Sequence, residues 1–334
     1  LKSNKFVHLR HYTQYSLSRG ALRINELISF CKKEQIPAAA ISDFNNLFGS
    51  LEFCIECSKS GIQPIVGINL LVRHNKFEDG YVLLLCKNKE GYENLVKLVS
   101  TAYLENSSSN DPFISLDNLF KFKNGLICLG GGIFGILTKN AIVNKDFSDQ
   151  LINIFKNKFG GNFFLEIQRI NDDQSSSLEN YILKKSLNLK IPVVATNENF
   201  FLNKNFFKTH DTLLSISQQK YLESEDRLKS NINFYLKTTN EMFDLFSDLP
   251  EVLQNTLNLA RKCSFFLEEK PPSLPKIQTN GINENDMLTE TAKNGILKRL
   301  GINKYHEVDK NYKDRLEYEL RVIIKMGYAS YFLI

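Results

Sequence analysis

Two carboxylates that follow predicted strands are the residues in this sequence best suited to chemistry. Asp43 follows the apolar run 38–42, and Glu198 follows the apolar run 192–197. Carboxylates that converge at one edge of a sheet can hold a divalent metal ion, and such an ion can activate water for the hydrolysis of a phosphoester. A hydrolytic site usually needs about three nitrogen or oxygen ligands per ion, so these two residues alone do not complete one.

Two histidines could supply a further ligand. His11 lies at the end of the first predicted strand, but side chains alternate along a strand, so His11 points away from the face of Arg10 and Tyr12 unless the strand bulges. His210 follows a helix-like stretch beside Asp211 and is better explained as a capping or core histidine. An active metal site would therefore need a repositioned His11 or His210.

Two short motifs favour structure over chemistry. Cys54 and Cys57 form a Cys-x-x-Cys motif, but they lie in a helical pattern and no second pair completes a zinc site. Three glycines at 130–132 follow a strand and could cradle a phosphate, but no Gly-Lys-Ser/Thr sequence comes after them. We therefore expect the cysteines to be core thiols and the glycines to allow tight packing or a turn.

The stretch 36–72 has the pattern of one complete strand, loop, helix and strand unit, and further copies of that unit follow it. Strands that are apolar throughout are covered on both faces, which favours a parallel sheet or barrel. Seven strands that alternate with helices predict an α/β fold of the TIM-barrel type, with functional residues at the C-terminal ends of the strands. The predicted strands are 6–10, 38–42, 64–72, 81–86, 126–129, 163–168 and 192–197.

The C-terminal part of the chain has a different pattern. Two short helices are predicted at 239–246 and 250–263, and the proline-rich segment 270–275 breaks all periodicity, which is typical of a linker. Helical patterns resume at 286–300 and 312–325, but two helices do not make a core of their own. Because the chain also lacks an initiator methionine, we expect a fragment whose second domain continues past residue 334.

Composition and charge argue against a membrane-spanning protein, a secreted protein and a protein with a basic arm for nucleic acid. The chain has 334 residues, 43% hydrophobic content and a formal charge of +5 that is spread along its length, so it suits a large core and has no concentrated basic arm. Its six cysteines lie mostly in apolar patterns, which is typical of reduced thiols in a cytoplasmic protein. No apolar run approaches the roughly 20 residues that span a bilayer, and no signal peptide opens the chain.

Several motifs resemble one known family across essentially the whole chain. The family is the polymerase and histidinol phosphatase (PHP) domain of bacterial replicative DNA polymerase III alpha subunits, followed by the opening of their palm domain. The motifs that carry the resemblance are FVHLRHYTQYSL at 6–17, AISDF at 40–44, GIQPIVG at 61–67, VVATN at 193–197, NFYLK at 233–237, DLPE at 248–251, RLEYEL at 315–320, KMGY at 325–328 and YFLI at 331–334.

The resemblance implies a degenerate metal site. Metal-dependent members carry His-x-His, Asp-His, Glu, Cys or His, and Asp-x-His at five places around the barrel. Only Asp43 matches that pattern, and Glu198 is a conservative replacement, so the resemblance implies the metal-free class with no catalytic residue. The positions that correspond to the family's metal ligands are Arg10, Tyr12, Asp43, Phe44, Asn69, Gly132, Glu198 and Phe200.

The resemblance also implies an architecture and partners. We expect a distorted (β/α)7 barrel of the PHP fold at 1–270, a linker at 271–279 and the helical beginning of the palm at 280–334. Such a PHP domain stabilises the polymerase and docks the separate proofreading exonuclease subunit, together with other replicase subunits. The complete protein is expected to be a cytoplasmic DNA-directed DNA polymerase that binds DNA and uses Mg²⁺, whereas this fragment needs no cofactor and contacts no membrane.

The alternative is an active PHP phosphoesterase or 3′–5′ exonuclease built on Asp43, Glu198 and a repositioned histidine. We favour the inactive domain, because the loss of most ligands removes most of the metal-assisted rate. In the inactive domain, Arg10 is expected to occupy the vacated metal space and to pair with Asp43, Glu198 or both.

Overall fold

The computed structural model describes residues 5–106, 111–170, 173–270, 277 and 281–334, with the backbone alone for residues 173–177. The chain divides into two compact units, Leu1–Glu268 and Glu269–Ile334, which we call unit 1 and unit 2. The linker expected at 271–279 lies outside the described residues except for residue 277. None of the described helices is both long enough and apolar enough to cross a membrane.

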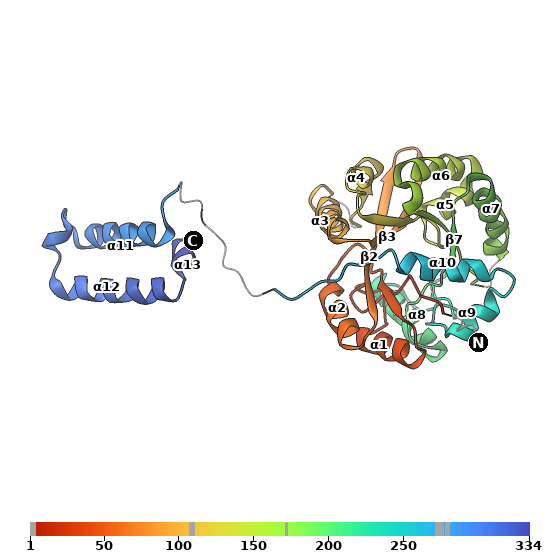
Figure 1. Cartoon of the computed structure of the whole chain (residues 1–334), viewed down its shortest axis with the longest axis horizontal. Helices are drawn as coiled ribbons and strands as arrows, with labels where there is room; N and C mark the ends of the chain where they lie inside the picture. The colour runs from red at the N-terminus through yellow and green to blue at the C-terminus, as the bar shows by residue number, and fades with distance from the viewer. Residues whose placement is uncertain (1–4, 107–110, 171–172, 271–276, 278–280) are drawn as a thin grey trace. The chain divides into compact units, whose positions relative to one another are not determined.

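Unit 1 is built on a curled sheet with helices around it (Figure 1). The strand order is β1-β2-β3-β5-β6-β7, with β4 pairing to β2 off this path. The pairings β1–β2, β2–β4, β5–β6 and β6–β7 are parallel. The strands are β1 (Ala38–Ile41), β2 (Gln63–His74), β3 (Phe77–Cys86), β4 (Ile114–Ser115), β5 (Leu126–Leu129), β6 (Phe163–Ile167) and β7 (Val193–Ala195).

One strand runs against the expected direction. The sequence analysis favoured a parallel sheet, but β3 is antiparallel to both β2 and β5. His74 pairs with Phe77, so only two residues connect β2 to β3. A two-residue connection can join antiparallel strands but not parallel ones, which need a crossover of a dozen or more residues.

The predicted strand 6–10 is not a strand of this sheet. The segment instead links the two ends of the sheet, because the Tyr12 amide donates to the Asn199 carbonyl at 3.0 Å and the Ser42 amide donates to the His11 carbonyl at 3.0 Å. Ser42 directly follows β1, and Asn199 lies four residues after β7. The sheet is therefore closed toward a barrel by an extended segment with isolated bridges, and this is the distortion of the TIM-like fold.

The strands are apolar throughout because both of their faces are buried. Side chains alternate along each strand, so one set packs inside the curl and the other packs against the helices. The inner set contains Val7, Leu9, Ala38, Ala40, Ile65, Leu83, Leu85, Ile127, Leu129, Phe164 and Val194. The outer set includes Val66, Ile68, Leu70, Val82, Leu84, Cys128, Leu165 and Val193.

Most helices of unit 1 surround the outer face of the sheet (Figure 1), whereas α10 also supplies Leu259 and Ala260 to the inner cluster. A representative case is α6, where the Asn144 side chain accepts a hydrogen bond from the Asp146 amide and the buried Leu151 and Phe155 form the apolar face. The helices are α1 (Ile24–Lys33), α2 (Ser50–Lys59), α3 (Lys89–Leu104), α4 (Leu116–Lys121), α5 (Ile136–Val143), α6 (Lys145–Phe159), α7 (Asp173–Leu189), α8 (Phe207–Ser217), α9 (Thr239–Leu245) and α10 (Pro250–Ala260). Short 3-10 turns are η1 (Gly160–Asn162) and η2 (Lys204–Phe206).

Unit 2 is helical and has a small core. Its elements are α11 (Glu284–Leu300), the 3-10 turn η3 (Tyr305–Glu307), α12 (Lys310–Lys325) and α13 (Ala329–Leu333). Its apolar cluster has three buried members, Leu288, Leu320 and Ala329, with partly buried residues packed against them. This core is small for the length of the helices that it joins.

Candidate functional site at the barrel mouth

The C-terminal ends of the parallel strands bring most of the predicted site residues together. Arg10, Tyr12, Asn69 and Glu198 all have side chains that are at most 1% exposed. Arg10 and Tyr12 precede the sheet, Asn69 lies on β2, and Glu198 follows β7. Because these four residues share one buried polar cluster, their interactions decide what the barrel mouth can do.

Arg10 is the centre of this cluster. Its guanidinium donates from Nη1 to the Tyr12 hydroxyl at 3.0 Å and to Asn69 Oδ1 at 3.2 Å, and from Nη2 to the Gly131 carbonyl at 3.3 Å. Its main partner is Glu166, which accepts from Nε at 2.5 Å and from Nη2 at 2.8 Å. Burial disfavours the charged guanidinium and is the largest single influence on it. The charge and hydrogen bonds of Glu166, together with Tyr12 and Glu198, outweigh burial and raise the Arg10 pKa well above its ordinary value.

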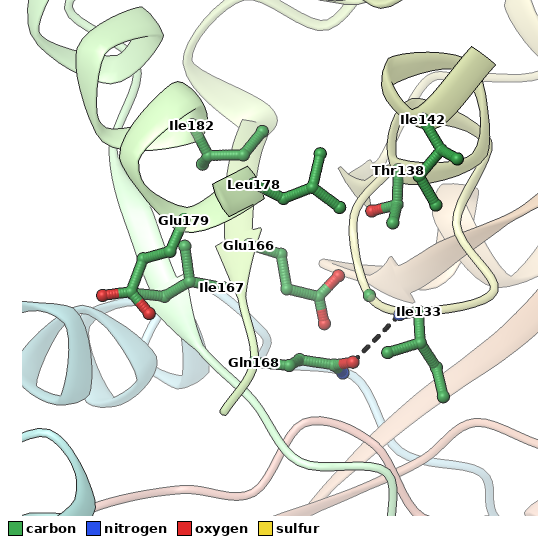
Figure 2. A pocket seen from close by; sticks show the side chains of 10 residues that line it. Ile133, Thr138, Ile142, Glu166, Ile167, Gln168, Leu178, Glu179 and Ile182 are labelled. Atoms are coloured by element: carbon green, nitrogen blue, oxygen red, sulfur yellow. Dashed lines mark hydrogen bonds between the residues drawn. The ribbon is translucent and has the colours of Figure 1, made fainter. Parts of the chain in front are cut away.

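Glu166 is the functional residue that the sequence analysis missed. It lies on β6, on the same face as Phe164 inside the curl, and it also accepts a hydrogen bond from the Thr196 hydroxyl. Figure 2 shows the side chains of Glu166, on β6, and of Gln168, just after β6, extending toward the loop that carries Ile133. The Ile133 amide donates to Gln168 Oε1 at 3.0 Å. A signal existed, because Glu166 and Gln168 interrupt an otherwise apolar strand at alternate positions.

Glu198 is a weaker partner of Arg10. The distance from Arg10 Nε to Glu198 Oε1 is 3.9 Å, and Oε1 accepts from Gln168 Nε2 at 2.9 Å. Among the described residues, Glu198 Oε2 has no hydrogen-bond partner. Burial raises the pKa of Glu198 above its ordinary value, which the nearby charge of Arg10 opposes. The expected pairing of Arg10 with Glu198 is thus present at long range, behind the pairing with Glu166.

Asp43 does not pair with Arg10, so of the two carboxylates that the sequence offered as partners only Glu198 lies within ion-pair distance. Its Oδ1 accepts from the Thr13 amide at 2.7 Å and the Ser16 hydroxyl at 2.5 Å, and its Oδ2 accepts from the Thr13 hydroxyl at 2.8 Å. Burial raises the Asp43 pKa to about 6, although these hydrogen bonds oppose the shift. Asp43 therefore ties the loop after residue 12 to the end of β1, which is a structural role.

Three aromatic rings fill the space beside the polar cluster. Tyr12 stacks on Phe44 with ring centroids 4.6 Å apart and on Phe200 with centroids 4.3 Å apart, at interplanar angles of 12° and 23°. Phe44 and Phe200 stand where the resemblance places histidine ligands. We call these three residues the Tyr12 stack. Carbon rings cannot ligate a cation, so the stack excludes two ligand positions.

The histidines do not complete a metal site. His11 Nδ1 lies 2.6 Å from the Ala40 carbonyl, and its Nε2 has no hydrogen-bond partner among the described residues. Its ring lies against that of His8, at a centroid distance of 5.6 Å. His210 lies between the Ser230 hydroxyl at 2.6 Å and the Arg19 carbonyl at 2.8 Å. His210 is a core histidine, as the sequence suggested, and both of its ring nitrogens are engaged.

The residues at this mouth do not fit the metal centre of metal-dependent PHP proteins. A guanidinium lies between Glu166 and Asn69, and the Tyr12 stack fills the adjoining volume. A search of the described part of the chain finds no group of three or more His, Cys, Asp or Glu residues that could hold a metal ion. A metal ion placed here would be repelled by the buried charge of Arg10 and would lack three ligands.

Gly132 and the cysteine motif behave as structural features. Gly132 has φ +74°, and a Cβ atom there would lie 3.0 Å from Glu198 Oε1 and 3.2 Å from Arg10 Nη2. The Gly135 amide donates to the Gly132 carbonyl at 3.0 Å, which confirms a tight turn after β5. Cys54 and Cys57 are buried free thiols on α2, also as predicted.

Comparison with known proteins matches both units. Residues 8–170 match the PHP domain family, and residues 286–334 match the family described as the bacterial DNA polymerase III alpha NTPase domain. DNA polymerase III subunit alpha of Rickettsia felis is 35% identical over 343 residues, which cover 99% of this chain and 28% of that protein. The same subunit of Borreliella burgdorferi is 37% identical over 345 residues, covering 99% and 30%. The chain thus spans less than a third of the length of these relatives.

A solved structure gives a weaker likeness. A Bifidobacterium adolescentis protein described as a metal-dependent phosphoesterase aligns with a TM-score of 0.42 at 10% identity, over 58% of this chain and 87% of that one. This overlap carries no argument about function. The relatives and the two family matches are decisive: the chain belongs to the family of bacterial DNA polymerase III alpha subunits and carries the PHP domain of that family.

Proposed function

We propose that unit 1 is a catalytically inactive PHP domain that serves as a scaffold and protein-docking module within a DNA polymerase III alpha subunit. One observation carries the proposal: the Arg10 guanidinium, bound to Glu166 and next to Glu198, occupies the polar centre of the barrel mouth. A fixed internal cation balances the charge of Glu166 and lies near Glu198, so no external metal ion is needed to hold these carboxylates together. Without a metal ion, the mouth lacks the means to activate water for phosphoester hydrolysis.

Metal content and nuclease activity test the inactive state. Elemental analysis of the 334-residue chain after gel filtration should find far less than one zinc or manganese ion per chain. A nuclease assay with single-stranded DNA and added Mn²⁺ should show no activity above the background of a mock purification. Close to one bound ion, together with nuclease activity that is lost in Asp43→Asn, would instead establish the active phosphoesterase. Asp43→Asn is the better variant, because Asp43→Ala would leave the Thr13 and Ser16 donors without an acceptor.

The docking partner that we propose is the proofreading exonuclease subunit. The support is the resemblance to the metal-free PHP class, and a domain that cannot hydrolyse DNA leaves proofreading to a separate protein. Calorimetric titration of the chain with the exonuclease of the same organism should show saturable binding, which Asp43→Asn leaves unchanged because Asp43 is 1% exposed. Absence of binding at about 50 μM of each protein, a concentration that detects interactions near −6 kcal/mol, would refute the docking role.

The activity of the complete protein is a further proposal. We infer that it is a cytoplasmic DNA-directed DNA polymerase that acts with other replicase subunits and uses Mg²⁺, because its relatives are named as DNA polymerase III alpha subunits. Phosphoryl transfer in such enzymes depends on metal ions beside the reacting groups. The full-length gene product should therefore extend a primed DNA template in the presence of Mg²⁺, and the 334-residue chain alone should not.

A further inference from the structure

A cavity of about 350 Å³ opens over the Tyr12 stack at the barrel mouth. Its volume lies at the lower end of the roughly 300–1,000 Å³ that is typical of small-molecule sites. Segments far apart in the sequence line it, from the loop that carries Arg19 to the segment that carries Phe234. The lining includes Arg19, Phe44, Arg73, Phe134, Lys139 and Lys229.

Three phenylalanines among the lining residues, Phe44, Phe134 and Phe200, form what we call the aromatic wall. Phe44 and Phe200 are more than 90% buried, and the Arg19 guanidinium lies over the Phe44 ring, 5.0 Å from its centroid. The Phe134 ring is edge-on to Phe44 at 6.5 Å and to Phe200 at 6.3 Å. Phe134 is only half-buried, so part of its ring is available to a planar ligand. Such rings bind nucleobases of any sequence, because every base has a π face.

The rim of the cavity has an excess of positive charge. Four cationic and two acidic side chains line it, and Arg73 pairs with Asp79 at 2.7 Å while Arg19 approaches Asp111 at 3.8 Å. Lys139 and Lys229 have no carboxylate within ion-pair distance among the described residues. His210 adds no charge near neutral pH, because burial lowers its pKa. Two lysines are therefore available to an anion.

We propose that this cavity binds a nucleotide without hydrolysing it, with the base against Phe134 and the phosphate held by Lys139 and Lys229. A phosphate alone would leave the aromatic wall unused, and a neutral apolar molecule would leave two lysines facing it without a counter-charge. The shared chemistry is a nucleobase that carries a phosphate, which either a free nucleotide or the end of a DNA single strand can supply. This proposal does not depend on the exonuclease as a partner.

Titrations of the 334-residue chain test the proposal directly. Thymidine 5′-monophosphate should bind saturably, with a dissociation constant of about 10⁻⁴ to 10⁻³ M by calorimetry or NMR. Inorganic phosphate should bind at least roughly tenfold more weakly, because it cannot use the aromatic wall. A 5′-phosphorylated tetrathymidylate separates the two sources: tighter binding than the mononucleotide assigns the site to a strand end, and equal or weaker binding assigns it to free nucleotide.

Variants at the rim test each part of the cavity. The double variant Lys139→Ala/Lys229→Ala should weaken mononucleotide binding roughly tenfold, whereas the control Lys32→Ala/Lys89→Ala removes two exposed lysines outside the cavity and should not. Phe134→Leu should weaken mononucleotide binding about tenfold and leave phosphate binding unchanged.

Four results would overturn the proposal. They are no saturable binding of the mononucleotide up to about 10 mM, binding no tighter than that of phosphate, binding unchanged in either rim variant, and equal loss in the control variant. The comparison of mononucleotide with phosphate needs no substitution, so it stands whether or not a variant folds.

Discussion

Single residues decide the state of the barrel mouth, and Arg10 is the most consequential of them. A buried cation is tolerated only when its charge and its donors are matched, and Glu166 supplies two acceptors in the fork geometry that a guanidinium prefers. The remaining donors reach Tyr12, Asn69 and Gly131. A neutral residue at position 10 would leave Glu166 as a buried charge without a counter-ion.

Removal of Arg10 should therefore destabilise unit 1. We expect Arg10→Met to lower the free energy of unfolding by about 3–5 kcal/mol, because it breaks a buried pair on one side. The double variant Arg10→Met/Glu166→Gln should recover part of that loss, since no net charge stays buried. Urea denaturation followed by circular dichroism measures the free energy of unfolding of both variants. The control is Arg315→Met, which removes an exposed helical ion pair with Glu319 and should change that free energy by less than about 0.5 kcal/mol. Equal effects of Arg10→Met and Arg315→Met would contradict the buried pairing.

Buried histidines should make the domain sensitive to acid. Burial lowers the pKa of His8 to about 3 and of His11 to about 4, below the value near 6.5 in an unfolded chain. Between about pH 4 and pH 6.5 the unfolded state binds more protons than the folded state. The contribution of the histidines to the free energy of unfolding is therefore fully present above about pH 6.5 and decreases as the pH drops below that value. Asp43 acts in the opposite sense between about pH 4 and 6, because its pKa in the folded chain is raised to about 6.

The two histidines should outweigh the buried carboxyl groups, among which Glu198, whose pKa burial also raises, acts in the same sense as Asp43. Between pH 7 and pH 5, each histidine should contribute a loss of roughly 2 kcal/mol and Asp43 a gain of roughly 1 kcal/mol. We expect the free energy of unfolding to fall over this range, and His11→Phe to reduce the fall. Denaturation curves at pH 5, 6 and 7 measure this, and an identical pH dependence in the variant would show that His11 is not the cause.

Part of the site was predictable from single residues. Alternation placed Arg10 and Tyr12 on one face and His11 on the other, and the structure agrees for these three residues, because Arg10 bonds to Tyr12 while His11 lies against the Ala40 carbonyl. Alternation fails earlier in the segment, since His8 lies against His11 although it has the parity of Arg10. Of the two carboxylates that were predicted as partners of Arg10, Glu198 lies within ion-pair distance and Asp43 does not, because Asp43 accepts three hydrogen bonds from its local loop. The main partner, Glu166, was not predicted. A sequence pattern shows which face a side chain occupies, but the choice among nearby carboxylates depends on distances that only the fold sets.

At the scale of elements, the length of the connection between two strands determines their relative direction, which the hydrophobic pattern of the strands does not show. Strands that are buried on both faces carry no mark of their direction, so the apolar runs 64–72 and 81–86 fit a parallel or an antiparallel pair equally well. The β2–β3 hairpin ends in exposed polar residues. The two-residue link at that end joins the strands directly, so β3 is antiparallel to β2. The segment 6–10 was predicted as a strand, and although it forms no strand of the sheet it does supply Val7 and Leu9 to the core.

The turn after β5 should resist substitution more than an ordinary left-handed turn. Gly132→Ala places a methyl group about 3 Å from both the Glu198 carboxylate and the Arg10 guanidinium, and the backbone there has φ +74°. Gly61→Ala is the matched control, since Gly61 has φ +67° and no atom within 4 Å of the added Cβ. We expect Gly61→Ala to cost about 1–2 kcal/mol and Gly132→Ala clearly more. Thermal or urea unfolding of the pair measures the difference, and equal losses would show that the crowding is relieved without cost.

At the scale of the whole molecule, the two units differ in how much apolar surface they bury. Unit 1 has large buried clusters on both faces of its sheet, whereas the cluster of unit 2 has three buried members. Isolated helices are marginal in water and depend on tertiary packing for most of their stability. The free energy that opens α11 and α12 should therefore be much smaller than that which opens β2 and β3.

Hydrogen exchange of the 334-residue chain tests this difference. Backbone amides of α11 and α12 should exchange at least about a hundredfold faster than those of β2 and β3, because a difference of roughly 3 kcal/mol in opening energy gives that ratio. The helix α10 of unit 1, which buries Leu253 and Leu259, serves as an internal control for a helix on a large core. Protection of α11 and α12 equal to that of α10 would show that unit 2 is stabilised by more than its own small cluster.

The pairing of Arg10 with Glu166 also bears on how this barrel could change over generations. A lineage that acquired a histidine at position 10 would lose the counter-charge of a buried carboxylate in the same step, and the rings at 44 and 200 would still deny a metal ion two ligands. Each single substitution toward a metal site would therefore pass through a less stable protein before the set of ligands was complete. The buried ion pair thus opposes the stepwise appearance of a metal site in this barrel.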